Sequence, residues 1–355
     1  MRINVKDKST TEGLPEFTPA EILKMATAKP ATSAQADERD GYYGVPLLKR
    51  PKWRWEIAFY FFFEGISAGS FLLAALADLS GNKRLRKLAR AAYDVSFLTL
   101  LPCPPLLIAD LGRPERFHHM LRVFKPMSPM NLGAWTLIGF SAPVTAIAAL
   151  RLIGDGLSND QNRLVLRSGL GAVGLPFALT MISYPGVLLS TTSTPVWSRS
   201  RFLGALFACS SIGNGAAATS FALSLRNGTH NVALERLAKI ESTARICEAA
   251  ALVAYLVTSK DAARPLTKGR HSPLFWLGAI GCGLILPVVL SDTRNRNKDR
   301  RRSRGKSIVR SVLSLAGGFA LKWAITHAGR QSADDVQATR NATRPNENAP
   351  GWGPA

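Results

Sequence analysis

Long apolar segments alternate with short polar ones along most of the chain. Eight of the apolar segments approach the roughly 20 residues that an α-helix needs to cross about 30 Å of hydrocarbon. The pattern therefore predicts an all-α integral membrane protein, a bundle of about eight transmembrane helices. The predicted spans are residues 57–78, 91–111, 131–153, 166–191, 202–225, 232–257, 272–290 and 308–326.

Polar segments flank this predicted bundle. Residues 1–41 are interpreted as a flexible tail without the apolar core of a signal peptide, residues 42–330 as the membrane domain, and residues 331–355 as a second polar tail. Lys and Arg in short loops set orientation: residues 292–306 hold eight and residues 81–90 hold five, on the same predicted side. We therefore expect that side to face the cytoplasm from the inner membrane, with both termini periplasmic.

The formal net charge of +21 is spread over the loops between apolar segments. Membrane orientation and anionic lipid headgroups explain this distribution better than nucleic acid does. A lipid membrane, and no nucleic acid, is the expected partner.

The cysteines and histidines are poorly placed to hold a redox centre. The four cysteines are far apart in apolar segments and form no CxxC, which argues against an iron–sulfur cluster or a zinc site in this chain. A transmembrane b-type haem needs histidines that face each other inside the bundle. All five histidines fall in predicted loops or at helix ends, so we expect no haem: His118, His119, His230, His271 and His327.

Ionisable residues inside a predicted span are costly and are functional candidates by default. Glu64 shares one face of the first span with Tyr60, Ser67 and Phe71, because they recur at helical spacing. A second group lies in the sixth span at i, i+4 and i+7 and is expected to face the bundle interior. The last two spans are expected to hold few polar groups. The proton-handling candidates are Glu64, Asp94, Glu241, Arg245 and Glu248, with purely structural roles as the alternative.

A polar segment between the second and third spans concentrates further candidate chemistry. Residues 109–135 read ADLGRPERFHHMLRVFKPMSPMNLGAW and fall where lipid gives way to water. Asp110 and Arg113 are three apart with Gly112 between them, so a tight turn can join their side chains by a charge-assisted hydrogen bond. Pro114 is expected to end the second helix.

Prolines predict two irregular helices. Pro102, Pro104 and Pro105 remove backbone donors within the second span, which favours a broken helix beside a pocket, with a packing kink as the alternative. In the fourth span, Pro185 is expected to disrupt the helix next to Tyr184, whose phenol can donate a hydrogen bond. From the residues alone, a simple kink is the commoner explanation.

These motifs together resemble the NrfD family, which includes the membrane subunit of polysulfide reductase. The resemblance rests on residues 109–135, on Pro-Lys-Trp-Arg-Trp from Pro51 and on Ser-Tyr-Pro-Gly from Ser183. It extends over about residues 42–330, with sharp motifs only in residues 42–190. Family members are quinone-interacting subunits, so the resemblance implies a menaquinone or ubiquinone ligand at Tyr184. The polar face of the first span and the charged pair favour Tyr60, Asp110 and Arg113 as neighbours of the quinone.

The resemblance also implies partners, because the chain carries no evident redox centre of its own. They are a ferredoxin-like iron–sulfur subunit and a molybdopterin catalytic subunit. The expected function is to pass electrons between the quinone pool and the iron–sulfur partner in a respiratory oxidoreductase, without catalysis by the chain alone. An ion- or proton-translocating protein is one alternative, and a passive membrane anchor for the catalytic subunits is another.

Overall fold

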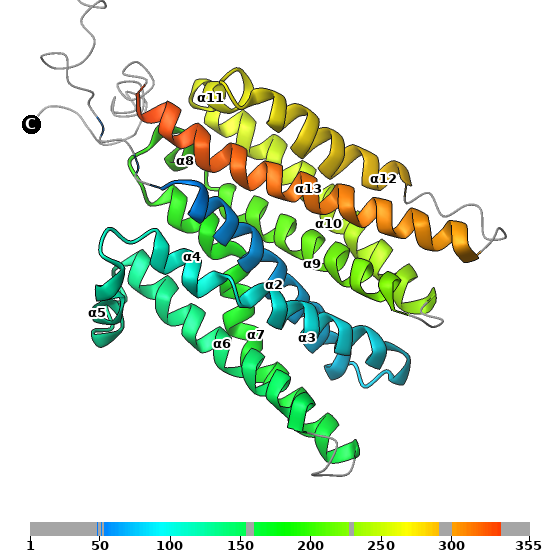
Figure 1. Ribbon diagram of the computed structural model, residues 1–355. Helices are drawn as coiled ribbons and strands as arrows, with labels where there is room; N and C mark the ends of the chain where they lie inside the picture. The colour runs from blue at the N-terminus through cyan, green and yellow to red at the C-terminus, as the bar shows by residue number, and fades with distance from the viewer. Residues whose placement is uncertain are drawn as a thin grey trace, which may run out of the picture. The chain divides into compact units, whose positions relative to one another are not determined.

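The computed structural model describes residues 53–153, 160–226, 231–290 and 300–334, together with Leu48 and Pro51. All regular structure within these ranges is helical, which confirms the predicted all-α class (Figure 1). The predicted N-terminal tail, nearly all of the C-terminal tail and most of the basic 292–306 loop lie outside the described residues.

Eight helical segments correspond to the eight predicted spans. They are α2 (Trp55–Leu79), α3 with α4 (Arg86–Leu100 and Cys103–Ala109), α6 (Pro129–Ile153), α7 (Asp160–Ser190), α9 (Leu203–Leu225), α10 (Asn231–Ser259), the π-helix η4 with α12 (Leu274–Ile285 and Leu286–Leu290), and α13 (Arg300–Ala333). Shorter helices join them: η1 (Lys83–Leu85), η2 (Pro114–Arg116), α5 (Phe117–Arg122), α8 (Pro195–Ser198), η3 (Lys260–Ala263) and α11 (Arg264–Thr267).

Six of the helical segments in the described ranges are long and apolar enough to cross a membrane: α2, α3 with α4, α6, α7, α9 and α13. The protein is therefore a multi-pass membrane protein. The segment Leu274–Leu290 is apolar but short, and α10 carries charged residues along its length. Membrane crossing by these two segments stays a prediction.

Consecutive long helices alternate in direction, so the bundle has two ends (Figure 1). The pocket end holds the start of α2, residues 110–128, α8 and α11. The opposite end holds η1 and the junctions that follow α6 and α9. Helices α2 and α9 lie at the centre, each in contact with α3, α7 and α13.

Small residues allow α2 and α9 to pack closely, as Gly65 and Gly69 predict. A Cβ atom on Gly69 would lie 2.2 Å from the carbonyl oxygen of Ser211, far inside van der Waals contact. From the other side, the Ser70 hydroxyl donates to the Gly215 carbonyl at 3.3 Å. The close contact holds the polar face of α2 inside the bundle, where Glu64 is buried.

Prolines act differently in the two helices that they mark. The second span is interrupted between Leu100 and Cys103, which confirms the predicted break. It ends at Ala109, so the prediction that Pro114 terminates it is wrong; Pro114 instead begins η2. Helix α7 is continuous through Pro185, so the predicted disruption there is also wrong.

Candidate functional site

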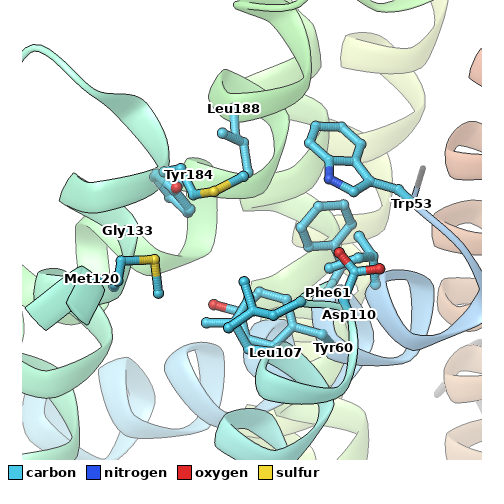
Figure 2. A pocket seen from close by; sticks show the side chains of 13 residues that line it. Trp53, Tyr60, Phe61, Leu107, Asp110, Met120, Gly133, Tyr184 and Leu188 are labelled. Carbon is cyan, nitrogen blue, oxygen red and sulfur yellow. The ribbon is translucent and has the colours of Figure 1, made fainter. Parts of the chain in front are cut away.

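A pocket lies at the pocket end of the bundle, between α2, α4, α6 and α7 (Figure 2). Its lining is mainly apolar and aromatic, with a few polar groups, which is the usual composition of a site for a small organic ligand. The lining residues are Trp53, Ile57, Tyr60, Phe61, Leu107, Asp110, Leu111, Met120, Met130, Gly133, Ala134, Tyr184 and Leu188.

Tyr184 reaches the pocket from α7 and is held against the start of α6. Its hydroxyl donates a hydrogen bond to the carbonyl oxygen of Pro129 at 2.6 Å. Gly133 leaves the space for this ring, because a Cβ atom there would lie 2.1 Å from the Tyr184 hydroxyl oxygen. The glycine of the Gly-Ala-Trp motif is thus explained by the tyrosine of the Tyr-Pro-Gly motif. To donate to a ligand, this hydroxyl must rotate away from Pro129.

Asp110 and Tyr60 contribute the other polar groups that sequence reasoning singled out (Figure 2). Tyr60 is buried on α2, and Asp110 follows the last residue of α4. Burial raises the pKa of Asp110 to about 6, and the charge of Glu56 acts in the same direction, whereas the charge and backbone N–H of Arg54 lower it. Asp110 therefore stays near its titration point in the neutral range.

The predicted pairing of Asp110 with Arg113 does not form. Arg113 is exposed, does not line the pocket, and makes no ion pair with Asp110 in the part of the chain that the structure describes. The basic group beside Asp110 is Arg54, from the Pro-Lys-Trp-Arg-Trp segment. The chain turns away after Ala109, which carries the Arg113 side chain towards solvent rather than back to Asp110.

Asn131 holds the segment that follows Asp110 over the pocket. Its side-chain amide donates to the carbonyls of Met120 at 2.8 Å and Val123 at 3.0 Å. Its side-chain carbonyl accepts from the backbone N–H of Lys125 at 2.7 Å. Sequence reasoning missed this residue, although a buried amide in the Met-Asn-Leu-Gly motif is a signal that could have found it. Through Asn131, Met120 is fixed against the cavity.

The cavity is narrow, with a volume of about 40 Å³. This is close to the roughly 30 Å³ that one water molecule occupies in the liquid, so an aromatic ring needs more space. Met120 and Met130 line the cavity, and Met130 is 49% exposed. Methionine side chains have three rotatable bonds and adapt to the shape of a ligand. A planar ring fits between the two tyrosines once these methionines move.

Comparison with known proteins adds to this geometry. Residues 47–333 match the family described as polysulphide reductase, NrfD. The chain belongs to this family. It is 28% identical to a membrane-family relative named as a component of the polysulfide reductase of Wolinella succinogenes, over 78% of this chain and 94% of that protein. It is 27% identical to protein NrfD of Escherichia coli over 78% and 95%. It is 22% identical to a component of the selenate reductase of Mesobacillus selenatarsenatis over 78% and 74%.

Below the pocket, this NrfD protein buries an unusual pair of charged groups. Glu64 is 1% exposed, and neither of its carboxylate oxygens has a hydrogen-bond partner among the described residues. Its charge interacts with that of Lys322, a fully buried residue of α13. The Lys322 amino group lies 3.6 Å from the centre of the Phe207 ring and 3.5 Å from the Phe207 carbonyl oxygen. The expectation of few polar groups in the last span missed Lys322.

The three charged residues of α10 face the bundle interior, as predicted. Arg245 donates to Glu248 at 2.5 Å and to the side-chain oxygen of Asn214 at 2.7 Å. Glu241 pairs instead with Arg310 of α13, at 3.1 Å. Each buried carboxylate of this NrfD helix therefore has a cationic partner, which is how charges are tolerated at membrane depth.

Asp94, the remaining proton-handling candidate, lies at the opposite end of the bundle. It forms ion pairs with Arg151 of α6 and Arg226 at the end of α9. The structure therefore does not bring Asp94 together with Glu64 or with the pocket.

The histidines and cysteines are distributed differently from expectation at some positions. His271 and His327 come together, with ring centres 5.2 Å apart, and His327 lies within α13. His230 lies outside the described residues. Cys103 is buried as expected, whereas Cys247 is exposed. Within the described ranges, no three His, Cys, Asp or Glu side chains are grouped so that they could hold a metal ion.

Proposed function

We propose that this protein is the quinone- or quinol-interacting membrane subunit of a multi-subunit molybdopterin oxidoreductase, and that its pocket binds the quinone headgroup. The observation that carries the proposal is the convergence of Tyr184, Tyr60 and Asp110 on one apolar cavity near the membrane boundary. Relatives named as components of a polysulfide reductase and of a selenate reductase support the assignment to such a complex.

Each polar residue of the pocket has a distinct role in this proposal. Tyr184 turns its hydroxyl from Pro129 to the ligand and donates to a quinone oxygen. Tyr60 approaches from α2 and orients the ring. Oxidation of a quinol releases two electrons and two protons, and Asp110 accepts a proton, since a carboxyl with a pKa of about 6 is mainly ionised at neutral pH. Arg113 lies too far outside the lining to contact the quinone in this arrangement.

Electrons leave to a partner that docks at the pocket end. We propose a ferredoxin-like iron–sulfur subunit there, followed by the molybdopterin subunit, with the inner membrane as the location and both termini periplasmic. The distance from the pocket to the surface is short at this end, because the lining includes Asp110 and Met130 at the boundary of the bundle.

Proton translocation is a second candidate function. One observation favours it: the pocket, Glu64, Lys322 and the α10 charges are linked by electrostatic interactions through α2, α13 and α10. A complex reconstituted in liposomes distinguishes the two functions. Translocation predicts that Glu248→Gln abolishes proton movement across the membrane while quinol oxidation continues, whereas simple quinol oxidation predicts no movement beyond the protons of the quinol itself.

The main test of the pocket is Tyr184→Phe in the assembled complex. A lost hydrogen bond to a buried carbonyl costs about 1–3 kcal/mol, so we expect quinone-linked turnover to fall roughly tenfold or more. Tyr255→Phe is the matched control, because the Tyr255 hydroxyl donates to the Val196 carbonyl at 2.6 Å outside the pocket. Electron transfer from the partner subunits to an artificial acceptor should survive in both variants. Full quinone-linked activity in both Tyr184→Phe and Asp110→Asn would place the quinone elsewhere.

A further inference from the structure

A cluster of arginines surrounds Asp94 at the end of the bundle opposite the pocket. Arg226 binds one carboxylate oxygen of Asp94 at 2.6 Å, and Arg151 binds the other. The three residues come from α9, α6 and α3, so the cluster joins helices that are distant in sequence. Arg151 and Arg226 nevertheless keep 50% and 43% of their side-chain surface exposed.

Positive charge is in excess among the described side chains of this cluster. Arg167 is matched by Asp78, with two hydrogen bonds of 2.6 and 2.7 Å. Asp94 is thus the one remaining described carboxylate for both Arg151 and Arg226. Arg90 and Arg167 also lie close enough to Arg151 for their charges to interact with it. A ligand with one or two negative charges would balance the excess.

Apolar side chains that face outwards border the cluster. Leu152 follows Arg151 and is 84% exposed, and Leu225 precedes Arg226 and is 56% exposed. Leu98, one turn after Asp94 on α3, is 63% exposed. In a membrane-spanning bundle these leucines face acyl chains, while the guanidinium groups lie at the level of the headgroups. Guanidinium groups match phosphate geometry well because they donate two parallel hydrogen bonds.

We propose that Arg151 and Arg226, with Arg90 nearby, bind the phosphate of an anionic phospholipid headgroup whose acyl chains lie along the exposed leucines. Asp94 orients the two guanidinium groups and limits their affinity by sharing their charge. The site lies at the other end of the bundle from the pocket, so its test is independent of any quinone.

Lipid binding to the purified full-length protein in a neutral detergent tests this proposal. The melting temperature should rise with added phosphatidylglycerol or cardiolipin, but not with phosphatidylcholine or inorganic phosphate, since a ligand that binds only the folded state stabilises it. The double variant Arg151→Gln/Arg226→Gln should bind phosphatidylglycerol about thirtyfold more weakly, from the usual contribution of each basic group beside an anionic headgroup. Arg264→Gln is the control, because Arg264 forms an exposed pair with Asp261 at the pocket end.

Asp94→Asn separates lipid binding from a purely structural role of the ion pairs. It removes the competing carboxylate and keeps both arginines, so phosphatidylglycerol should bind more tightly than to wild type. A misfolded variant cannot give this gain. Equal stabilisation by phosphatidylcholine, unchanged affinity in the double variant, or no gain in Asp94→Asn would overturn the proposal. A full effect from inorganic phosphate would overturn it in favour of a free-anion site.

Discussion

Substitution of Gly133 by alanine examines the contact on which the pocket geometry depends. The new Cβ would lie 2.1 Å from the hydroxyl oxygen of Tyr184, and 2.2 and 2.5 Å from two carbon atoms of its ring. Normal contacts between carbon atoms are about 3.5–4.0 Å, so the ring must move by more than about 1 Å. Tyr184 is 7% exposed, so other buried groups must move with it.

The expected effect on stability follows from opposing contributions. Forcing an extra methyl group into a packed site costs about 1–3 kcal/mol, and loss of the Tyr184–Pro129 hydrogen bond costs about 1 kcal/mol more. Replacing glycine by alanine inside a helix returns about 1 kcal/mol. We therefore expect Gly133→Ala to destabilise the protein by about 1–3 kcal/mol, and quinone-linked turnover to fall more than tenfold as the phenol leaves its position.

Two further variants separate the effect on turnover from the effect on folding. Adding Tyr184→Leu to Gly133→Ala removes the clashing ring, so the melting temperature should recover while quinone-linked turnover does not. Gly169→Ala in α7 is the control, because a Cβ atom there meets nothing within 4 Å. Wild-type turnover in a well-assembled Gly133→Ala complex would refute the placement of Tyr184 in the quinone site.

Three other groups give further predictions. Quinol-linked turnover of the wild type should fall as the pH drops through about 6, because Asp110 can accept a proton only above its raised pKa; a pH profile of Asp110→Asn should lack this limb, and a persisting limb would exclude Asp110 as its source. Asn131→Ala removes three hydrogen bonds from the segment over the pocket, so protease cleavage within residues 113–128 should become faster, and unchanged cleavage would contradict this role. Lys322→Met leaves Glu64 and Glu248 without a nearby cation and should destabilise the protein by about 3–5 kcal/mol. Adding Glu64→Gln should recover part of that loss in a thermal melt, and no recovery would argue against the Glu64–Lys322 interaction.

The helices and their inward faces could be predicted because each depends on local spacing. Apolar length located the helices, and the i, i+4, i+7 spacing correctly turned Glu241, Arg245 and Glu248 inwards. The small residues Gly65 and Gly69 likewise indicated the close approach of α9. These patterns report which side of a helix faces a neighbour, and they require no knowledge of which neighbour it is.

The partners across the bundle could not be predicted, because they depend on how distant helices are placed. Arg113 is nearer to Asp110 in sequence, yet Arg54 lies beside it in the fold. Lys322 was hidden in an apolar segment and shows its role only where α13 passes Glu64 of α2. The continuous course of α7 through Pro185 also depends on its packing against α6 and α9. Whether Tyr60, Asp110 and Tyr184 bind a quinone stays a prediction.

Helix α6 carries Gly133 near one end and Arg151 near the other, which gives it the properties of a lever. The stretch between these residues is about 27 Å long at 1.5 Å per residue. If Arg151 is the fixed point, a tilt of only about 3° moves Gly133 by about 1.4 Å over this length. That is comparable to the whole displacement that a methyl group at Gly133 would impose on Tyr184. The width of the pocket is therefore sensitive to how firmly the far end of α6 is anchored.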